Sequence, residues 1–106
     1  MTEIGPRIPT SGDGKHQSAA RLIGTYHREQ LRALLGHLRT AFDRLDGGTI
    51  DEFDLDEMIR HYERSTAKLR NFCGSSGAER EEAARNLEAL RASGEEPNWW
   101  DVGAQR

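Results

Sequence analysis

The stretch LDGGTIDE, residues 45–52, decides the fold because it separates two long segments of helical periodicity. Before it, apolar and small residues recur at alternating steps of three and four, the heptad pattern of a packed helix; these are Ala20, Gly24, His27, Leu31, Leu34, Leu38, Ala41 and Leu45. After it, the same spacing returns at Leu55, Met58 or Ile59, Tyr62, Leu69 and Phe72. The sequence therefore predicts one helix from about Gln17 or Ser18 to Leu45 and a second from about Ile50 to Phe72 or Cys73.

The residues inside this stretch indicate a tight turn between the two helices. Gly47 and Gly48 tolerate the left-handed backbone that ends a helix, and Thr49 with Glu52 has the form of a capping box that starts the next one. Two helices of similar length joined by about four residues fold back on each other. We therefore expect an all-α fold built on an antiparallel, coiled-coil-like hairpin, in which the numbers of facing residues sum to roughly 96.

Further breaks divide the rest of the chain. The segment 74–77 (GSSG) interrupts the helical pattern, and Ser76 with Glu79 forms a second capping box, which predicts a short third helix ending near Ala92. Residues 1–16 hold two prolines and three glycines and predict a disordered, flexible N-terminal arm. The expected organisation is this arm, a helical domain at 17–94 and a tryptophan-containing C-terminal tail at 95–106.

The composition narrows the function classes. The 106 residues are 35% hydrophobic and 31% charged, with a formal net charge of -3 and a mean hydropathy of -0.82. So polar a chain buries a limited core, and we expect a protein partner or a homodimer with a four-helix core to complete it. No apolar run approaches the roughly 20 residues that span a bilayer, and the first residues lack the apolar segment of a signal peptide. We expect no membrane contact and a cytoplasmic location; the Arg, Ala and Gly bias is compatible with a high-GC bacterial source.

Motifs for catalysis or metal binding are missing from the sequence. It has no nucleophile elbow, Walker loop or G-x-G-x-x-G, and a single cysteine excludes an intramolecular disulfide and a cysteine zinc cluster. The segment 43–54 resembles an EF-hand calcium loop. However, Leu45 and Gly47 stand where that family needs side-chain oxygens, and Asp54 replaces its bidentate Glu. We therefore expect a plain hairpin turn, with no metal, no cofactor and no enzymatic activity.

The one pair of residues that could form a reactive site is His27 and Cys73. In the expected hairpin they lie within about one helical turn of each other, and Cys73 falls just before the third helix, whose dipole favours a thiolate. A Cys–His pair of this kind can act as a redox-sensitive or nucleophilic thiol. The alternative is that Cys73 is a small buried hydrophobe and that His27 is a buried polar residue of the seam.

Charge is distributed unevenly along the expected hairpin. The arginines of the first helix are spaced by seven, four and seven and therefore share one stripe; they are Arg21, Arg28, Arg32 and Arg39. In the turn region from Asp43 to Glu57, in contrast, seven acidic residues stand against Arg44 as the only basic one. A basic shaft with an acidic tip favours docking on a protein partner or assembly with another copy. Binding of nucleic acid through the arginine stripe is the alternative, and a solvated helix surface needs no partner at all.

Two adjacent tryptophans, Trp99 and Trp100, stand in the otherwise polar tail. An exposed tryptophan leaves a large apolar surface in water. The tail could fold back over the small-residue side of the third helix, or it could insert an aromatic anchor into a partner. Because adjacent side chains point in different directions, one ring can pack at home while the other reaches outward.

These observations favour a small non-enzymatic adaptor or regulatory protein that acts through protein–protein contacts. Trp99, Trp100 and the arginine stripe are its expected partner-binding residues. A nucleic-acid-binding regulator is the second hypothesis, and a thiol- or metal-dependent protein is the third.

Overall fold

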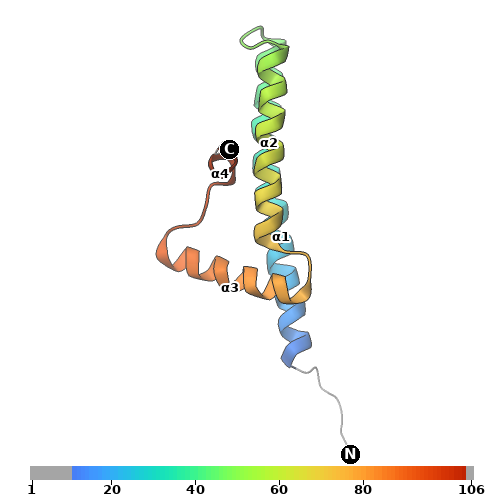
Figure 1. The fold of residues 1–106 in the computed structure, drawn as a ribbon, viewed down its shortest axis with the longest axis vertical. Helices are drawn as coiled ribbons and strands as arrows, with labels where there is room; N and C mark the ends of the chain where they lie inside the picture. The colour runs from blue at the N-terminus through green and yellow to red at the C-terminus, as the bar shows by residue number, and fades with distance from the viewer. Residues whose placement is uncertain (1–10, 105–106) are drawn as a thin grey trace, which may run out of the picture.

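The computed structural model describes residues 11–104, and within them the chain forms four helices and no strand (Figure 1). The helices are α1 (Ser11–Asp46), α2 (Glu52–Cys73), α3 (Gly77–Ser93) and α4 (Trp99–Ala104). The expected all-helical fold is therefore confirmed for the described part of the chain. The short helix α4 was not expected from the sequence.

Helices α1 and α2 lie side by side and run in opposite directions, joined at one end of the molecule by the glycine turn (Figure 1). Two contacts fix their register. The rings of Tyr26 and Phe72 lie 6.0 Å apart, and His37 and His61 both stack on the ring of Trp100. In each pair the two residue numbers sum to 98, close to the value expected from the sequence.

The first helix begins earlier than expected. Helix α1 includes Ser11, six residues before the predicted start at Gln17, so residues 11–16 belong to a helix and not to a flexible arm. Pro9 is the last proline before this helix, and after it no residue removes a backbone donor until the turn. The remainder of the predicted arm, residues 1–10, lies outside the described residues.

The turn between α1 and α2 is capped differently from the prediction. Asp51 is the N-cap of α2, and it forms a reciprocal capping box with Asp54 in place of the expected Thr49 and Glu52. The amide of Thr49 donates to the carbonyl of Arg44 at 2.8 Å, so this residue still belongs to the closing turn of α1. Aspartate is also a stronger N-cap than threonine.

Helix α3 begins and ends as predicted. Ser76 and Glu79 form its capping box, and Gly94 ends it in the left-handed conformation. Gly74, with φ of 76°, turns the chain out of α2, and α3 then runs across the hairpin and packs on α1 (Figure 1).

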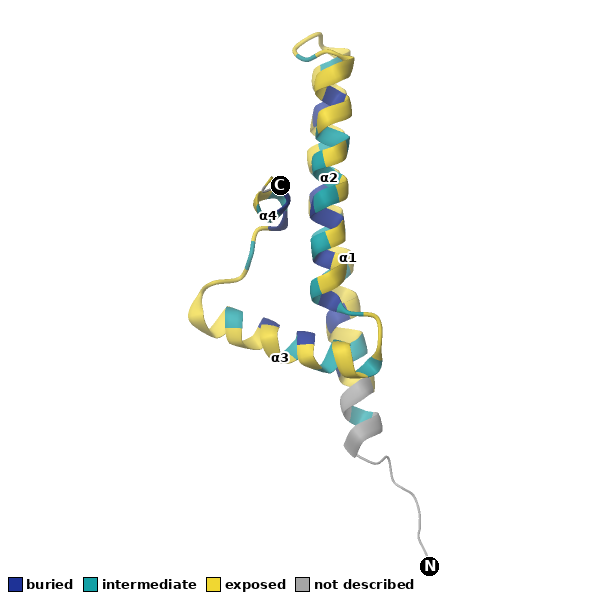
Figure 2. Ribbon diagram, viewed as in Figure 1, coloured by how far each residue is buried: buried dark blue, intermediate teal, exposed yellow. Residues whose placement is uncertain are grey.

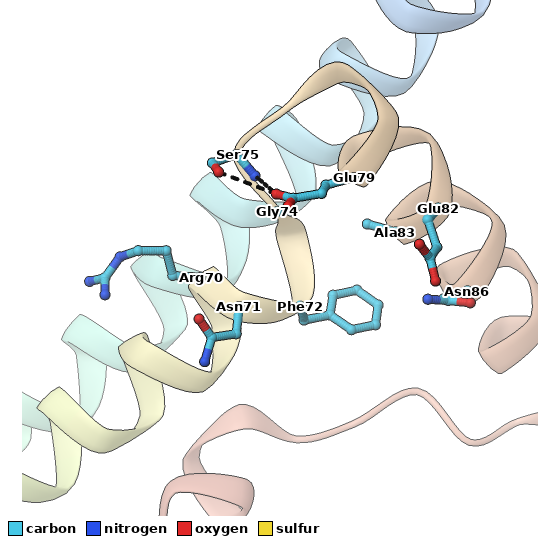
Figure 3. Close-up of a pocket in the computed structure, with 9 residues that line it drawn as sticks. All are labelled: Arg70, Asn71, Phe72, Gly74, Ser75, Glu79, Glu82, Ala83 and Asn86. Atoms are coloured by element: carbon cyan, nitrogen blue, oxygen red, sulfur yellow. Dashed lines mark hydrogen bonds between the residues drawn. The ribbon is translucent and has the colours of Figure 1, made fainter.

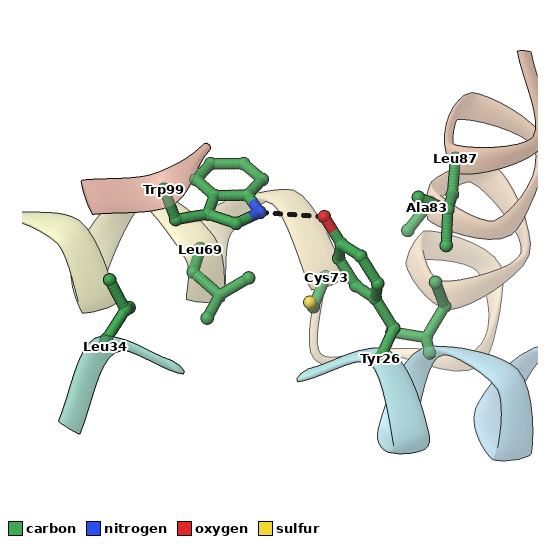
Figure 4. Close-up of a cluster of buried hydrophobic side chains, with 8 residues drawn as sticks. Tyr26, Leu34, Leu69, Cys73, Ala83, Leu87 and Trp99 are labelled. Atoms are coloured by element: carbon green, nitrogen blue, oxygen red, sulfur yellow. Dashed lines mark hydrogen bonds between the residues drawn. The ribbon is translucent and has the colours of Figure 1, made fainter. Parts of the chain in front are cut away.

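The core lies where the four helices meet, at the open end of the hairpin (Figures 2 and 4). Every helix contributes to it; its buried members are Ile23, Tyr26, Leu34, Leu69, Cys73, Ala83, Leu87 and Trp99. The far end of the hairpin, near the turn, carries mostly exposed and half-buried residues (Figure 2). The fold is therefore a long two-helix arm with α3 packed at its open end and α4 packed beside the middle of α2 (Figure 1).

Candidate partner-binding surfaces

Trp99 is part of the hydrophobic core. Its side chain is 7% exposed, and its indole Nε1 donates a hydrogen bond of 2.8 Å to the hydroxyl of Tyr26 (Figure 4). Its ring packs at a tilt against Phe72, with the centroids 5.3 Å apart. Burial raises the pKa of Tyr26, and the Trp99 hydrogen bond partly offsets that rise. Trp99 therefore joins the C-terminal helix to α1 and α2.

Trp100 stacks on two histidines. Its ring lies 4.2 Å from the ring of His37 on α1, nearly parallel to it, and 3.6 Å from the ring of His61 on α2. The Nε2 atom of His61 also lies 2.7 Å from the carbonyl oxygen of Trp100, at hydrogen-bonding distance. The second tryptophan thus bridges the two helices of the hairpin.

Basic side chains of α2 bind the carbonyl end of α4. Arg64 Nε donates to the carbonyl of Gly103 at 2.9 Å, and Lys68 Nζ donates to that of Val102 at 3.2 Å. A helix C-terminus carries partial negative charge, so cations there are favourable. Two basic residues of α2 thus hold the C-terminal tail in place.

Gly103 allows α4 to approach α2 closely. A Cβ atom at this position would lie 1.9 Å from Ser65 Oγ and 2.7 Å from Ser65 Cα. Ser65 is itself fully buried, and its hydroxyl is the one buried side-chain polar atom of the described residues that has no hydrogen-bond partner. The tail therefore packs tightly on α2, and the alternative in which it covers α3 is wrong. Both tryptophan side chains therefore pack against helices of the same chain.

Cys73 lies in an apolar, buried environment, whereas reactive thiols are accessible and have a lowered pKa. Cys73 is 1% exposed in the core, and burial raises the pKa of its thiol to about 11. The pKa of His27 is lowered by burial and by the charge of Arg70. Near neutral pH the thiol is thus protonated, which supports the interpretation of Cys73 as a buried hydrophobe over that of a dipole-stabilised thiolate.

The arginine stripe is exposed along α1, as its spacing predicts; its members are Arg21, Arg28, Arg32 and Arg39. An apolar row accompanies it that the sequence analysis did not identify. Leu35 and Phe42, seven residues apart, are 46% and 48% exposed. Both are large apolar residues that fall outside the heptad seam predicted to form the core. Their position outside the seam was the sequence signal that could have predicted their exposure.

The tip of the hairpin carries the most exposed aromatic residue of the described chain. Phe53 is 85% exposed at the first turn of α2. Acidic residues surround it in the sequence, and all of them are exposed; they are Asp51, Glu52, Asp54, Asp56 and Glu57. The expected acidic tip is therefore also an aromatic tip.

A cavity of about 560 Å³ lies between the end of α2 and the start of α3 (Figure 3). Phe72 extends into it from α2, while Glu82 and Asn86 face it from α3. The carboxylate of Glu79 at its edge accepts from the amide and hydroxyl of Ser75, at 2.8 and 3.2 Å, and these bonds hold its pKa below the usual 4.5. The polar groups at this edge thus serve the turn into α3.

The described residues contain no group of three or more His, Cys, Asp or Glu side chains that could hold a metal ion. Within the same residues no helix is long and apolar enough to cross a membrane. Comparisons of the chain with family models, curated proteins and solved structures return no match. Any functional assignment therefore rests on the surfaces described above.

Proposed function

We propose that this protein is a non-enzymatic, cytoplasmic adaptor or regulatory protein that acts by binding other proteins through its helical hairpin. The observation that carries the proposal is Phe53, 85% exposed at the end of a long two-helix arm. A phenylalanine in water leaves a large apolar surface exposed, and such rings are frequent anchors of protein interfaces.

The charge around Phe53 defines the chemistry of the partner. Exposed carboxylates flank the ring on α2, so the matching surface combines an apolar recess with basic residues around it. Part of this charge is already balanced, because Arg60 pairs with Asp56 at 2.9 Å and with Glu57 at 3.9 Å. Glu52 and Asp54 lie closer to the tip, and Asp54 also caps the helix.

The tryptophan tail supports this surface from a distance. Trp99 links α1 to α2 near the open end of the hairpin through Tyr26 and Phe72. Trp100 links them near the middle of α2 through His37 and His61. We propose that the tail keeps the coiled-coil-like hairpin rigid, so that the tip is presented in one orientation. A preorganised surface loses less entropy on binding.

A pull-down from extract of the native cell, with and without nuclease, tests the proposal. The tagged wild-type chain is compared with Phe53→Ala and with Ala89→Ser, an exposed change on α3. We expect a stoichiometric protein partner that survives nuclease, is kept by Ala89→Ser and is lost with Phe53→Ala. Equal recovery with all three chains contradicts a role for the tip.

A nucleic-acid-binding regulator is the second candidate, favoured by the exposure of all four arginines of the stripe on α1. Phosphate contacts make such binding strongly salt-dependent. Arg28→Ala and Arg32→Ala should then each weaken binding across sequences and reduce the salt slope. Binding that is tight and indifferent to both substitutions excludes this candidate.

A further inference from the structure

The side of the hairpin opposite α4 is open. His37 on α1 and His61 on α2 mark the side on which α4 sits. Residues two positions away along a helix point nearly the opposite way, because each residue turns the helix by about 100°. Leu35 on α1 and Ile59 and Glu63 on α2 therefore face away from α4. We call this side the open face.

An apolar strip forms the middle of the open face. Phe42 lies one heptad from Leu35 and is exposed to a similar degree. Leu31, Leu38 and Ile59 are half-buried beside them, between α1 and α2. An exposed apolar strip of this kind on a small polar chain is typical of an interaction surface.

The two edges of the open face carry opposite charge. On the α1 edge, three exposed arginines follow the apolar strip; they are Arg28, Arg32 and Arg39. On the α2 edge, the spacing of four, three and four places exposed carboxylates around Ile59; they are Glu52, Asp56, which pairs with Arg60, and Glu63. The exposed Arg70, one heptad beyond Glu63, ends this acidic edge towards the open end of the hairpin. A face with an apolar middle, one basic edge and one acidic edge is complementary to itself.

We propose that a second copy of this chain covers the open face, with a twofold axis parallel to the hairpins. This axis places α1 of one copy over α2 of the other, so that Arg32 and Arg39 meet the acidic part of the partner's α2 edge. Arg28 lies level with position 70, where the acidic edge has ended. An axis perpendicular to the hairpins places α1 on α1, and the arginines then face arginines. Charge therefore selects the parallel arrangement.

The register of the hairpin brings particular charges together. Facing positions sum to 98, so Glu63 is level with position 35 of α1. Arg32 is three residues away from that level, about 4.5 Å along the axis, which its long side chain covers. A twofold axis along the hairpin preserves these levels, so Arg32 of one copy lies opposite the partner's Glu63. Twofold symmetry makes this contact twice.

The size of the face fits a stable dimer. Helix α2 has 22 residues. At a rise of 1.5 Å per residue and a width of about 10 Å per helix, the face measures roughly 33 by 20 Å. The two copies together would then bury about 1,300 Å², within the range of specific interfaces.

This inference rests on the proposed function and deepens it. In the parallel arrangement both hairpin tips lie at the same end of the dimer, so two Phe53 rings are presented together. A partner with two matching sites would then bind with avidity.

Light scattering after size-exclusion chromatography tests the dimer. The wild type should have the mass of two chains. Arg32→Glu and Glu63→Arg should each weaken the dimer by at least about tenfold, because each creates two like-charge contacts. Both residues are exposed, so circular dichroism should show unchanged helicity. Arg85→Glu on α3, an exposed change of the same charge, is the control and should leave the dimer intact.

Mixing the two variants gives the decisive result. In a heterodimer of Arg32→Glu and Glu63→Arg chains, both contacts pair opposite charges, so the mixture should recover the dimer mass. A monomeric wild type, variants as dimeric as the control, or a mixture that stays monomeric overturns the inference. None of these results affects the Phe53 pull-down, whose failure would instead remove the proposed function.

Discussion

Substitution of Gly103 by alanine tests the docking of α4, which packs beside the middle of α2. By helix propensity alone this change should stabilise α4, because alanine is favoured over glycine by about 1 kcal/mol. The structure predicts the opposite sign. The new Cβ would lie 2.7 Å from Ser65 Cα, and a backbone atom of a packed helix cannot rotate away. Helix α4 must therefore shift by about 1 Å to restore an ordinary contact.

The loss in the free energy of unfolding comes from the overpacked contact and from the hydrogen bond that the shift of α4 breaks. Overpacking a close contact costs about 1–3 kcal/mol. Loss of the buried bond from Trp99 to Tyr26 adds about 1 kcal/mol. The gain of about 1 kcal/mol in helix propensity offsets part of this cost, so the net effect is a loss of about 1–3 kcal/mol in the free energy of unfolding. For a domain of this size, that lowers the melting temperature by roughly 4–24 °C.

Thermal unfolding followed by circular dichroism measures this loss of stability. Tryptophan fluorescence shows whether α4 is the part affected, because Trp99 and Trp100 are the only tryptophans of the sequence and both lie in α4. We expect a lower melting temperature and a red-shifted emission for Gly103→Ala. Ala104→Ser, at the exposed neighbouring position, should behave like the wild type. A melting temperature for Gly103→Ala equal to or above that of the wild type would refute the close packing of α4 on α2.

Three further predictions concern individual side chains. Ser65→Ala should raise the free energy of unfolding by about 1 kcal/mol, because it removes a buried hydroxyl without a partner; a loss in a urea titration would show that the hydroxyl is bonded. Cys73 should react with iodoacetamide at pH 7 far more slowly in the native chain than in the urea-unfolded chain, because burial raises its pKa to about 11; equal rates would place the thiol at the surface. Glu79→Gln should destabilise the protein near neutral pH, because the folded state lowers the pKa of the Glu79 carboxyl and so favours its charged form. This difference in stability should vanish as the pH falls below 4.5 and through the lowered folded-state pKa, where the carboxyl becomes protonated. A difference that is constant with pH would exclude the charge as its cause.

Local sequence signals predicted most of the helical framework. The heptad spacing before and after the glycine turn located α1 and α2, and the Ser76–Glu79 box located the start of α3. Helix α4 was missed because six residues are too few to form a helix from local preference. Its stability comes from tertiary contacts, the fit of Gly103 against Ser65 and the bonds from Arg64 and Lys68, which no local pattern contains.

The candidate site was harder to predict than the fold. Trp99 and Trp100 were predicted to bind a partner because large aromatic residues in a polar tail are unusual, but the structure packs both against the hairpin. For Cys73 the sequence left two interpretations open, a thiolate favoured by a helix dipole and a small buried hydrophobe; its burial and its raised pKa support the second. Phe53 falls outside the predicted heptad seam of α2, and this mismatch was a sequence signal of its exposure; its 85% exposure became clear only from the packing of α1 against α2.

A photo-crosslinking amino acid placed at position 53, inside the native cell, tests the central claim most directly. The claim is that the hairpin tip contacts another protein. We expect one defined covalent adduct with a different protein when the crosslinker replaces Phe53, and no such adduct when it replaces the exposed Ala89 of α3. No adduct from position 53, or the same set of adducts from both positions, would contradict it.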